Sequence, residues 1–286
     1  MQSEKLTFTG HDTFHCRSFW LKKGVDFLED SGEFGAENAV LKLGVGKNMV
    51  AAIHYWLKAF GVKDEDGNVS ELADSMLGRG GFDEYLEFPG SIWIWQYHLV
   101  KLGKASIYSL FFKEFRKSRH RNQFQKSQLY QFLNLKTEGK VAEKTLQNDI
   151  KVFIKMYLVE EKTGKGIEDD LSSMFVELNL ISEVPISSNE VTYQLRVDHK
   201  KEIPSLVFLY CILDYFPDRE SIAVEEIIDT VGDALVCTDE GVERHIGMLS
   251  QLFPGQVTFK EDAGRKEVQL DPVLDKWEIL ERYYND

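Results

Sequence analysis

Cysteine and proline are scarce in this sequence of 286 residues, which contains three cysteines and six prolines. Cys16, Cys211 and Cys237 are odd in number, lie far apart and form no C-x-x-C pair, which excludes a disulfide framework and indicates reduced thiols. Long apolar runs are also absent, because the longest, at 206–213, is followed at once by Asp214 and is too short to span a bilayer. The first residues contain no apolar region of a secretory signal. We therefore expect a cytoplasmic protein without a membrane segment.

The composition is that of a folded globular protein. Hydrophobic residues make up 43% of the chain and aromatic residues 12%, so a disordered chain is not expected. The length suffices for two or three compact units, since domains mostly run to roughly 100–150 residues.

Charge is unevenly distributed along the chain. The formal net charge is −13, which by itself argues against nucleic-acid binding. Residues 101–155, however, hold 13 of the 34 Lys and Arg residues and 4 of the 47 Asp and Glu residues. Because phosphate contacts dominate non-specific nucleic-acid affinity, this basic stretch predicts a DNA-binding unit. The alternatives are a helical surface that happens to be lysine-rich and a basic patch that docks on an acidic partner subunit.

Residues 37–60 predict two helices joined by a turn, with the spacing of a helix-turn-helix. The turn falls at Gly44-Val45-Gly46, where glycine reaches positive φ without steric cost. The apolar positions of the two helices are Ala39, Leu43, Val45, Val50, Ile53 and Leu57. Two packed helices of an ordinary α-helical domain would show the same pattern, so the motif alone does not establish DNA binding.

The opposite face of the second helix is predicted to be open to a DNA groove. It carries Lys47, Asn48, Ala52, Tyr55 and Lys58. A polar face with one small residue can lie against a major groove. A Walker phosphate-binding loop is excluded here, because it needs glycine in place of Leu41 and Ser or Thr in place of Asn48. Downstream we expect a small hairpin around Asp66-Gly67-Asn68, a hinge at 77–81 and a largely buried helix at 88–102.

The basic stretch predicts a second helix-turn-helix. A helix that begins near Ala105 leads into the basic cluster Arg116, Lys117, Arg119 and Arg121. A later helix has Leu146, Ile150, Phe153 and Tyr157 on one side and Lys144, Gln147, Asn148, Lys151 and Lys155 on the other. We expect the lysines and arginines to contact phosphates. The amides of Asn148 and Gln147 are the predicted base readers.

The C-terminal part predicts an acidic unit of the same kind. A linker is expected at 163–166, a strand within 191–198 and a buried helix at 204–216, followed by helix, helix and hairpin from Ser221 onward. The helices of this unit carry Glu225, Glu226, Asp229, Asp233, Glu240 and Glu243. Acidic faces repel phosphate, so we predict a protein-interaction module here.

Three ligand-type side chains lie close together near the start of the chain. His11, His15 and Cys16 fall within six positions, with Asp12 beside them. A zinc site usually needs a fourth ligand with paired spacing, and a Cys-His pair adjacent in sequence is not thereby aligned for catalysis. These residues are weak metal or catalytic candidates, and we expect them to form a local hydrogen-bonded cap on the first helix.

Three motifs give the chain a family resemblance. They are GHDTF at 10–14 with Arg17, Trp20 and Leu21, LGVGKNMV at 43–50 with Tyr55 and Trp56, and KTLQND at 144–149. With these motifs the sequence resembles the bacterial domain of unknown function 4007 family over nearly its whole length. The resemblance implies an association with bacterial defence loci, beside proteins similar to phosphoadenosine phosphosulfate reductases and DNA phosphorothioation components. It supplies no catalytic residues.

The sequence thus predicts a mainly α protein with small β-hairpins, built of tandem helix-turn-helix or winged-helix-like units. The predicted units are an N-terminal helix-turn-helix unit (1–100), a basic unit (101–160) and an acidic linker with a C-terminal unit (161–286). The predicted function is a non-enzymatic, cofactor-free DNA-binding adaptor of a DNA modification or anti-phage defence system, with duplex DNA and protein subunits as partners. The alternative is a scaffold subunit that never contacts DNA, and an enzyme using the His11 region is a weaker third possibility.

Overall fold

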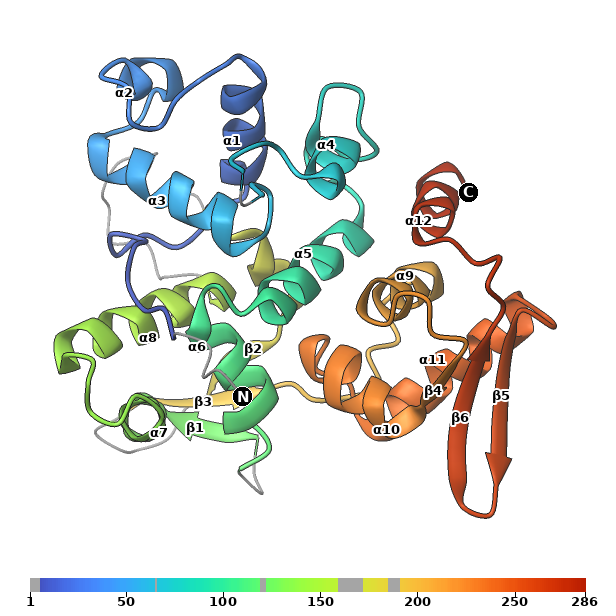
Figure 1. Ribbon diagram of the computed structural model, residues 1–286. Helices are drawn as coiled ribbons and strands as arrows, with labels where there is room; N and C mark the ends of the chain where they lie inside the picture. Colours follow the sequence, from blue (N-terminus) through green and yellow to red (C-terminus); the bar gives the residue numbers. More distant parts are fainter. Residues whose placement is uncertain (1–5, 65, 119–121, 159–171, 185–190) are drawn as a thin grey trace. The chain divides into compact units, whose positions relative to one another are not determined.

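The computed structural model describes residues 6–64, 66–118, 122–158, 172–184 and 191–286 (Figure 1). The chain divides into two compact units. The N-terminal unit consists of Met1–Glu87 and His98–Arg196, and the C-terminal unit of Phe88–Tyr97 and Val197–Asp286. Helix α5 (Pro89–Leu102) is continuous from one unit into the other and is buried along most of its length, as predicted. The described residues are mainly α-helical with two small antiparallel sheets, which confirms the prediction of a mainly α protein with small β elements.

Four helices form the first half of the N-terminal unit: α1 (Trp20–Glu29), α2 (Ala39–Leu43), α3 (Lys47–Ala59) and α4 (Glu71–Leu77) (Figure 1). The predicted turn between α2 and α3 is present, with Gly44 in a left-handed conformation at a φ of 62°. Ala39, Leu43 and Val50 pack with Phe27 of α1 in one apolar cluster. The burial of this cluster fixes the angle between α2 and α3.

One flank of α3 differs from the prediction of an open polar face. Ala52 is fully buried and Tyr55 is half-buried. The Tyr55 ring packs edge-on against His11, with 5.6 Å between the ring centroids. The chain before α1 therefore covers this flank, which the periodicity of α3 alone does not reveal.

The second half of the N-terminal unit combines helices with a three-stranded sheet. Helix α6 (Ser106–Ser109) continues into the π-helical turn η1 (Leu110–Phe115), which is followed by β1 (Gln123–Gln125), α7 (Lys126–Lys136) and α8 (Glu143–Tyr157). The short helix η3 (Met174–Leu178) leads to β2 (Ile181–Val184) and β3 (Thr192–Leu195). All pairs are antiparallel in the order β1-β3-β2, and Phe124 of β1 pairs with Tyr193 of β3.

This pairing moves a predicted boundary. The sequence assigned everything after residue 160 to a linker and a C-terminal unit, whereas β2 and β3 complete the sheet that begins with β1. Strand pairing between segments far apart in sequence decides the boundary, and composition does not report it. The linker predicted at 163–166 lies outside the described residues.

The order of helices and strands in the C-terminal unit is similar to that in the second half of the N-terminal unit. Helix α9 (Ser205–Tyr215) precedes β4 (Ser221–Ala223), α10 (Val224–Ile227) with the π-helical turn η4 (Ile228–Gly232), and α11 (Asp239–Leu252). The hairpin of β5 (Val257–Asp262) and β6 (Arg265–Leu270) follows, then α12 (Lys276–Asn285), which packs on α9. The strand order is β4-β6-β5, so in both sheets the last strand lies between the other two (Figure 1). Within the described ranges, no helix has the length and apolar character needed to cross a membrane.

Candidate nucleic-acid interface

Helix α8 is anchored by the apolar stripe that its sequence predicts. Leu146, Ile150, Phe153 and Tyr157 are all buried. The Phe153 ring lies 4.5 Å from that of Phe111, and Tyr157 stacks on Phe175 at 5.6 Å, both between ring centroids. This packing against η1 and η3 fixes which side of α8 faces solvent.

The opposite side of α8 is open. Lys144, Gln147 and Lys151 are exposed, and Asn148 and Lys155 are half-buried. Among the residues that the structure describes, neither Lys144 nor Lys151 has an ion-pair partner, so both ammonium groups are available to an anion. Gln147 donates from Nε2 to Oε1 of Glu143 at 2.7 Å, which holds its amide along the helix.

Other parts of the basic stretch are less available. Lys136 pairs with Glu114, and Lys140 pairs with Glu138, so two of its cations are neutralised. At the end of η1, Arg116 is half-buried and Lys117 is exposed. Arg119 and Arg121 lie outside the described residues, so their predicted phosphate contacts have no structural counterpart here.

A second polar helical face belongs to the same unit. On α3, Lys47, Asn48 and Lys58 are exposed, as predicted. The glycine turn before α3 leaves its first residues uncovered, because an added side-chain carbon at Gly44 or Gly46 would meet no atom within 4 Å. Tyr55 borders this face and is not freely exposed.

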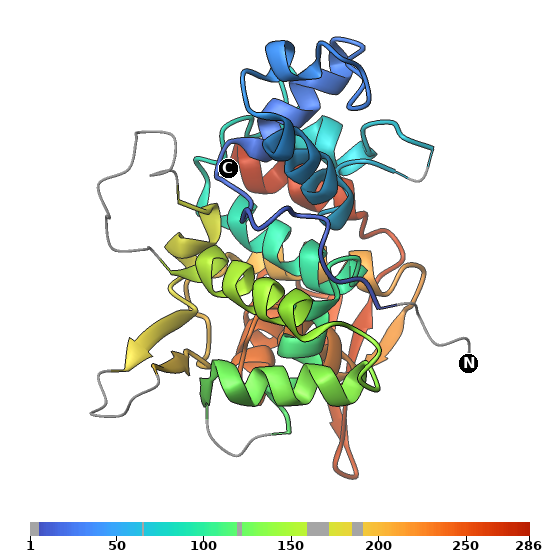
Figure 2. The ribbon, with the colours of Figure 1, turned by 90° about the vertical axis from the view of Figure 1, so that its left-hand side faces the viewer.

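A buried polar pair links the chain before α1 to α8. His11 Nδ1 accepts a hydrogen bond from the Thr13 amide at 3.2 Å, so Nε2 carries the proton and donates to Asp149 Oδ1 at 3.1 Å. The Asp149 carboxylate also accepts from the Thr9 amide at 3.0 and 3.1 Å. Figures 1 and 2 both show this segment running between α3 and α8. Sequence reasoning missed Asp149, although an acid next to Ile150 of the apolar stripe on a basic helix was a visible signal.

The weak metal and catalytic candidates do not assemble into such a site. Both ring nitrogens of His11 are engaged, and burial raises the pKa of the Cys16 thiol well above its ordinary value, which disfavours the thiolate. The Cys16 amide donates to the Met156 sulfur at 3.3 Å, and His15 is half-buried. Within the described part of the chain, no three His, Cys, Asp or Glu side chains are grouped to hold an ion. Helix α1 starts after Phe19, whose own side chain makes no cap hydrogen bond.

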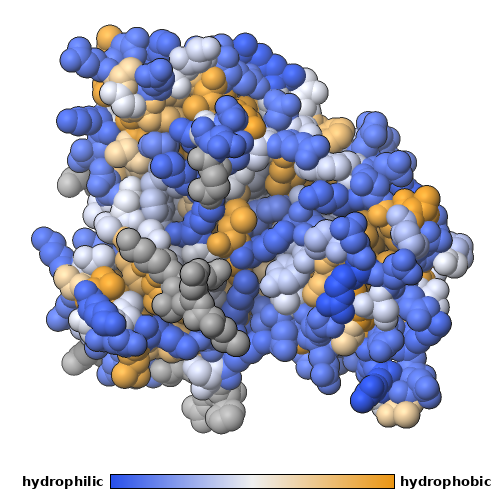
Figure 3. All heavy atoms as spheres, viewed as in Figure 1, coloured by the Kyte–Doolittle hydropathy of each residue, from blue (hydrophilic) through white to orange (hydrophobic). Residues whose placement is uncertain are grey.

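A groove of about 630 Å³, lined by apolar and charged side chains, lies on the same unit between α1, α2 and the loop before α5. Phe19, Leu41 and Tyr85 stand at this groove with 50%, 84% and 60% of their surface exposed. Figure 3 shows apolar side chains reaching the surface over α1 and α2, in its upper left part. Exposed apolar side chains that gather at one groove mark a protein contact surface more often than scattered ones do.

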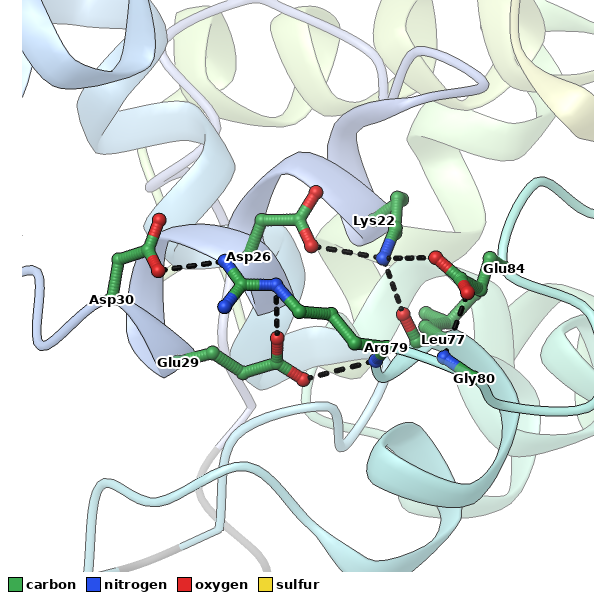
Figure 4. A network of polar contacts seen from close by, with 8 residues as sticks. All are labelled: Lys22, Asp26, Glu29, Asp30, Leu77, Arg79, Gly80 and Glu84. Atoms are coloured by element: carbon green, nitrogen blue, oxygen red, sulfur yellow. Dashed lines mark hydrogen bonds and ion pairs between the residues drawn. The ribbon is translucent and has the colours of Figure 1, made fainter.

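A polar network ties α1 to the loop that follows α4 (Figure 4). Lys22, only 6% exposed, pairs with Asp26 at 2.8 Å and Glu84 at 2.7 Å and donates to the Leu77 carbonyl at 3.0 Å. Burial opposes its charge, but the two carboxylates raise the pKa of Lys22 above its ordinary value. Arg79 pairs with Asp30 at 2.6 Å. The segment predicted as a hinge at 77–81 is therefore fastened to α1.

The acids of the C-terminal unit are only partly available. Glu225, Asp229 and Glu240 are exposed. Glu226 pairs with Arg219 at 2.8 Å and Glu243 with Lys266 at 2.7 Å, while Asp233 is fully buried. The acidic surface predicted from six residues is therefore reduced, since Glu226 and Glu243 are paired and Asp233 is inside the unit.

Comparison with known proteins places the chain in a family. Residues 8–284 match the family described as "Protein of unknown function (DUF4007)", and the chain belongs to it. A crystal structure of magnesium ion-bound SspB is similar, with 25% identity and a TM-score of 0.83, over 98% of this chain and 88% of that one. A second SspB crystal structure has 24% identity and a TM-score of 0.82 over the same shares. No curated protein matches the chain.

Proposed function

We propose that this member of the DUF4007 family is a non-enzymatic adaptor that binds duplex DNA in a bacterial DNA modification or anti-phage defence system. The observation that carries the proposal is the open face of α8, where Lys144 and Lys151 are exposed beside the amides of Gln147 and Asn148. Lysines at this spacing on one helical face suit phosphate contacts, and the amides suit adenine edges. The defence setting rests on the family resemblance of the sequence.

The order of elements supports the same proposal. Both units have the order helix, strand, helix, helix and two paired strands, with the last strand in the centre and with η3 before β2 in the N-terminal unit. This order resembles that of a winged helix. In this arrangement α8 takes the position of the recognition helix that enters a major groove. In the C-terminal unit α11 takes that position, and its exposed acids Asp239 and Glu240 disfavour DNA there. We therefore assign DNA binding to the N-terminal unit, and we propose that the acidic C-terminal unit contacts protein subunits and not DNA.

The test is fluorescence anisotropy of a labelled duplex titrated with the protein at low and moderate salt. Lys144→Glu/Lys151→Glu should abolish most binding, because two phosphate contacts become repulsive. For each phosphate contact that is removed, the negative slope of log K against log salt should become less steep by about 0.9. Lys201→Glu/Lys260→Glu, which makes the same charge change at exposed lysines of the C-terminal unit, is the matched control and should bind as wild type does. Absence of binding by folded wild-type protein at low salt would refute the proposal.

A second candidate is a scaffold subunit that binds protein and not DNA. The observation that favours it is the groove lined by Phe19, Leu41 and Tyr85. A scaffold would tolerate Lys144→Glu/Lys151→Glu and lose its partner with Leu41→Asp. The two functions are compatible in an adaptor, which needs one surface for DNA and another for protein.

A further inference from the structure

We propose that residues 9–13, clamped by Asp149, set α3 and α8 so that one DNA duplex contacts the polar faces of both helices. His11 and Asp149 are then positioning residues for DNA binding, and they need not touch DNA themselves. This inference rests on the proposed function.

The clamp joins the helices through contacts at both ends of the segment. On α8, the Asp149 carboxylate accepts from the Thr9 amide and from His11 Nε2. On α3, the Trp56 ring stacks on His11 at 6.1 Å between centroids, and its Nε1 donates to the Phe14 carbonyl at 3.1 Å. A shift of α8 along its axis relative to α3 would therefore break either the hydrogen bonds of the segment to Asp149 or its contacts with Trp56.

The segment is held in a conformation that its sequence does not favour. Thr9, Gly10, Asp12 and Thr13 have positive φ values of 68°, 99°, 45° and 68°. Such a conformation is a genuine outlier for a β-branched residue, and it persists only where surrounding contacts enforce it. The buried His11–Asp149 pair and the Thr9–Asp149 hydrogen bonds supply those contacts.

The outer side of the segment is open to solvent. Thr9, Gly10, Asp12 and Thr13 are exposed, although His11 between them is buried. Asn148, a proposed base reader, directly precedes Asp149 on α8. Tyr55, which packs on Gly10, lies one helical turn from Lys58 on α3. The segment thus has an exposed outer side, contacts α3 at Tyr55 and contacts α8 at Asp149.

The clamp predicts energetic coupling between α3 and α8 on DNA. Lys47→Glu/Lys58→Glu removes the α3 contacts and should lower duplex affinity by at least about tenfold at low salt, with a salt slope reduced by about two units. Asp149→Asn places an amide against the Thr9 N–H and should lower affinity to a similar extent. In the Asp149→Asn background, Lys47→Glu/Lys58→Glu should cost less than about twofold, because α3 no longer reaches the duplex that α8 holds.

The experiment is anisotropy of a fluorescein-labelled duplex with these variants in the full chain, beside their thermal unfolding curves. Gly10→Ala gives a second reading that keeps both buried polar groups, since its new side-chain carbon would lie 2.6 Å from the Tyr55 ring and displace the segment. His245→Gln is the control for general loss of stability, because His245 is equally buried in the C-terminal unit, with Nε2 3.0 Å from the Lys200 carbonyl oxygen.

We expect Lys47→Glu/Lys58→Glu to cost much less duplex affinity in the Asp149→Asn and Gly10→Ala backgrounds than in the wild type. We expect His245→Gln to bind the duplex normally. Wild-type affinity in folded Asp149→Asn, or additive losses with the α3 variant, would overturn this inference while leaving the α8 site intact. Absence of duplex binding by the wild type would overturn the proposed function and this inference together.

Discussion

His11 Nε2 lies 3.1 Å from Asp149 Oδ1, although 138 positions separate the two residues in the chain. Both side chains are buried, and the two belong to different motifs of the family resemblance, GHDTF and KTLQND. Tyr55 and Trp56, which accompany the remaining motif, LGVGKNMV, pack against the His11 ring. The three motifs thus meet at one polar contact inside the N-terminal unit.

This contact predicts an asymmetry between single and double substitutions. His11→Leu should lower the free energy of unfolding by about 2 kcal/mol, because it removes the side-chain donor of the buried Asp149 carboxylate and leaves only the Thr9 amide to balance its charge. His11→Leu/Asp149→Leu should recover part of this loss, since no unpaired charge remains. Urea unfolding of the two variants measures the difference. A double variant less stable than the sum of the single losses would contradict the explanation.

The Lys22 network predicts a similar cost at the α1 surface. Lys22→Met keeps most of the side-chain volume but leaves Asp26, Glu84 and the Leu77 carbonyl without their shared donor. We expect a loss of about 2 kcal/mol in unfolding free energy. Lys23→Met is a suitable comparison, because Lys23 donates to the Leu43 carbonyl and has no carboxylate partner among the described residues, and it should cost less than half as much. Equal losses would show that the carboxylates contribute nothing.

Two glycines offer a matched test of the α2–α3 turn. An added side-chain carbon meets no atom within 4 Å at either Gly44 or Gly35, but only Gly44 has a left-handed φ, of 62°. Gly44→Ala should therefore destabilise the protein by about 1 kcal/mol through backbone strain alone. Gly35→Ala should be neutral or slightly stabilising. Thermal unfolding of both variants checks the prediction, and a stable Gly44→Ala protein would argue against the left-handed turn.

His54 predicts a loss of stability in mild acid. Burial, followed by the charges of Lys58 and Lys63, lowers the pKa of His54 to about 4, and its ring stacks on Phe34 at 4.6 Å. The unfolded chain binds a proton here from about pH 6.5 downward while the folded chain does not, so stability falls as the pH drops from 6.5 toward 4. His54→Phe keeps the stacking without the titration. Between pH 7 and pH 5 the free energy of unfolding of this variant should fall by about 1 kcal/mol less than that of the wild type, as measured by urea unfolding at each pH. If the unfolding free energies of His54→Phe and the wild type fall equally with pH, His54 does not cause the loss of stability in acid.

The cysteines predict an unreactive native protein. Cys16, Cys211 and Cys237 are all buried and form no disulfide, and burial raises the pKa of Cys16. Thiolate reagents such as DTNB should therefore modify none of them in the native state and all three in guanidinium chloride. Rapid modification of one thiol in native protein would identify an accessible cysteine and reopen the catalytic hypothesis for the His11 region.

Local patterns were sufficient for the helices and for the open face of α8. The recurrence of Leu146, Ile150, Phe153 and Tyr157 at helical spacing determined which side is buried, because one side of an amphipathic helix must leave water. Gly44-Val45-Gly46 likewise located a turn, since few residues accept its left-handed conformation.

Contacts between distant segments were decided only by the tertiary structure. The sequence could not show that residues 9–13 cover Tyr55, that Asp149 receives His11, or that β2 and β3 complete the sheet begun by β1. Each depends on pairing across many intervening residues, where the burial of polar groups in matched geometry, and not local propensity, selects the partner. Sequence alone thus determined the faces of the helices, and the folded chain decided which faces remain open.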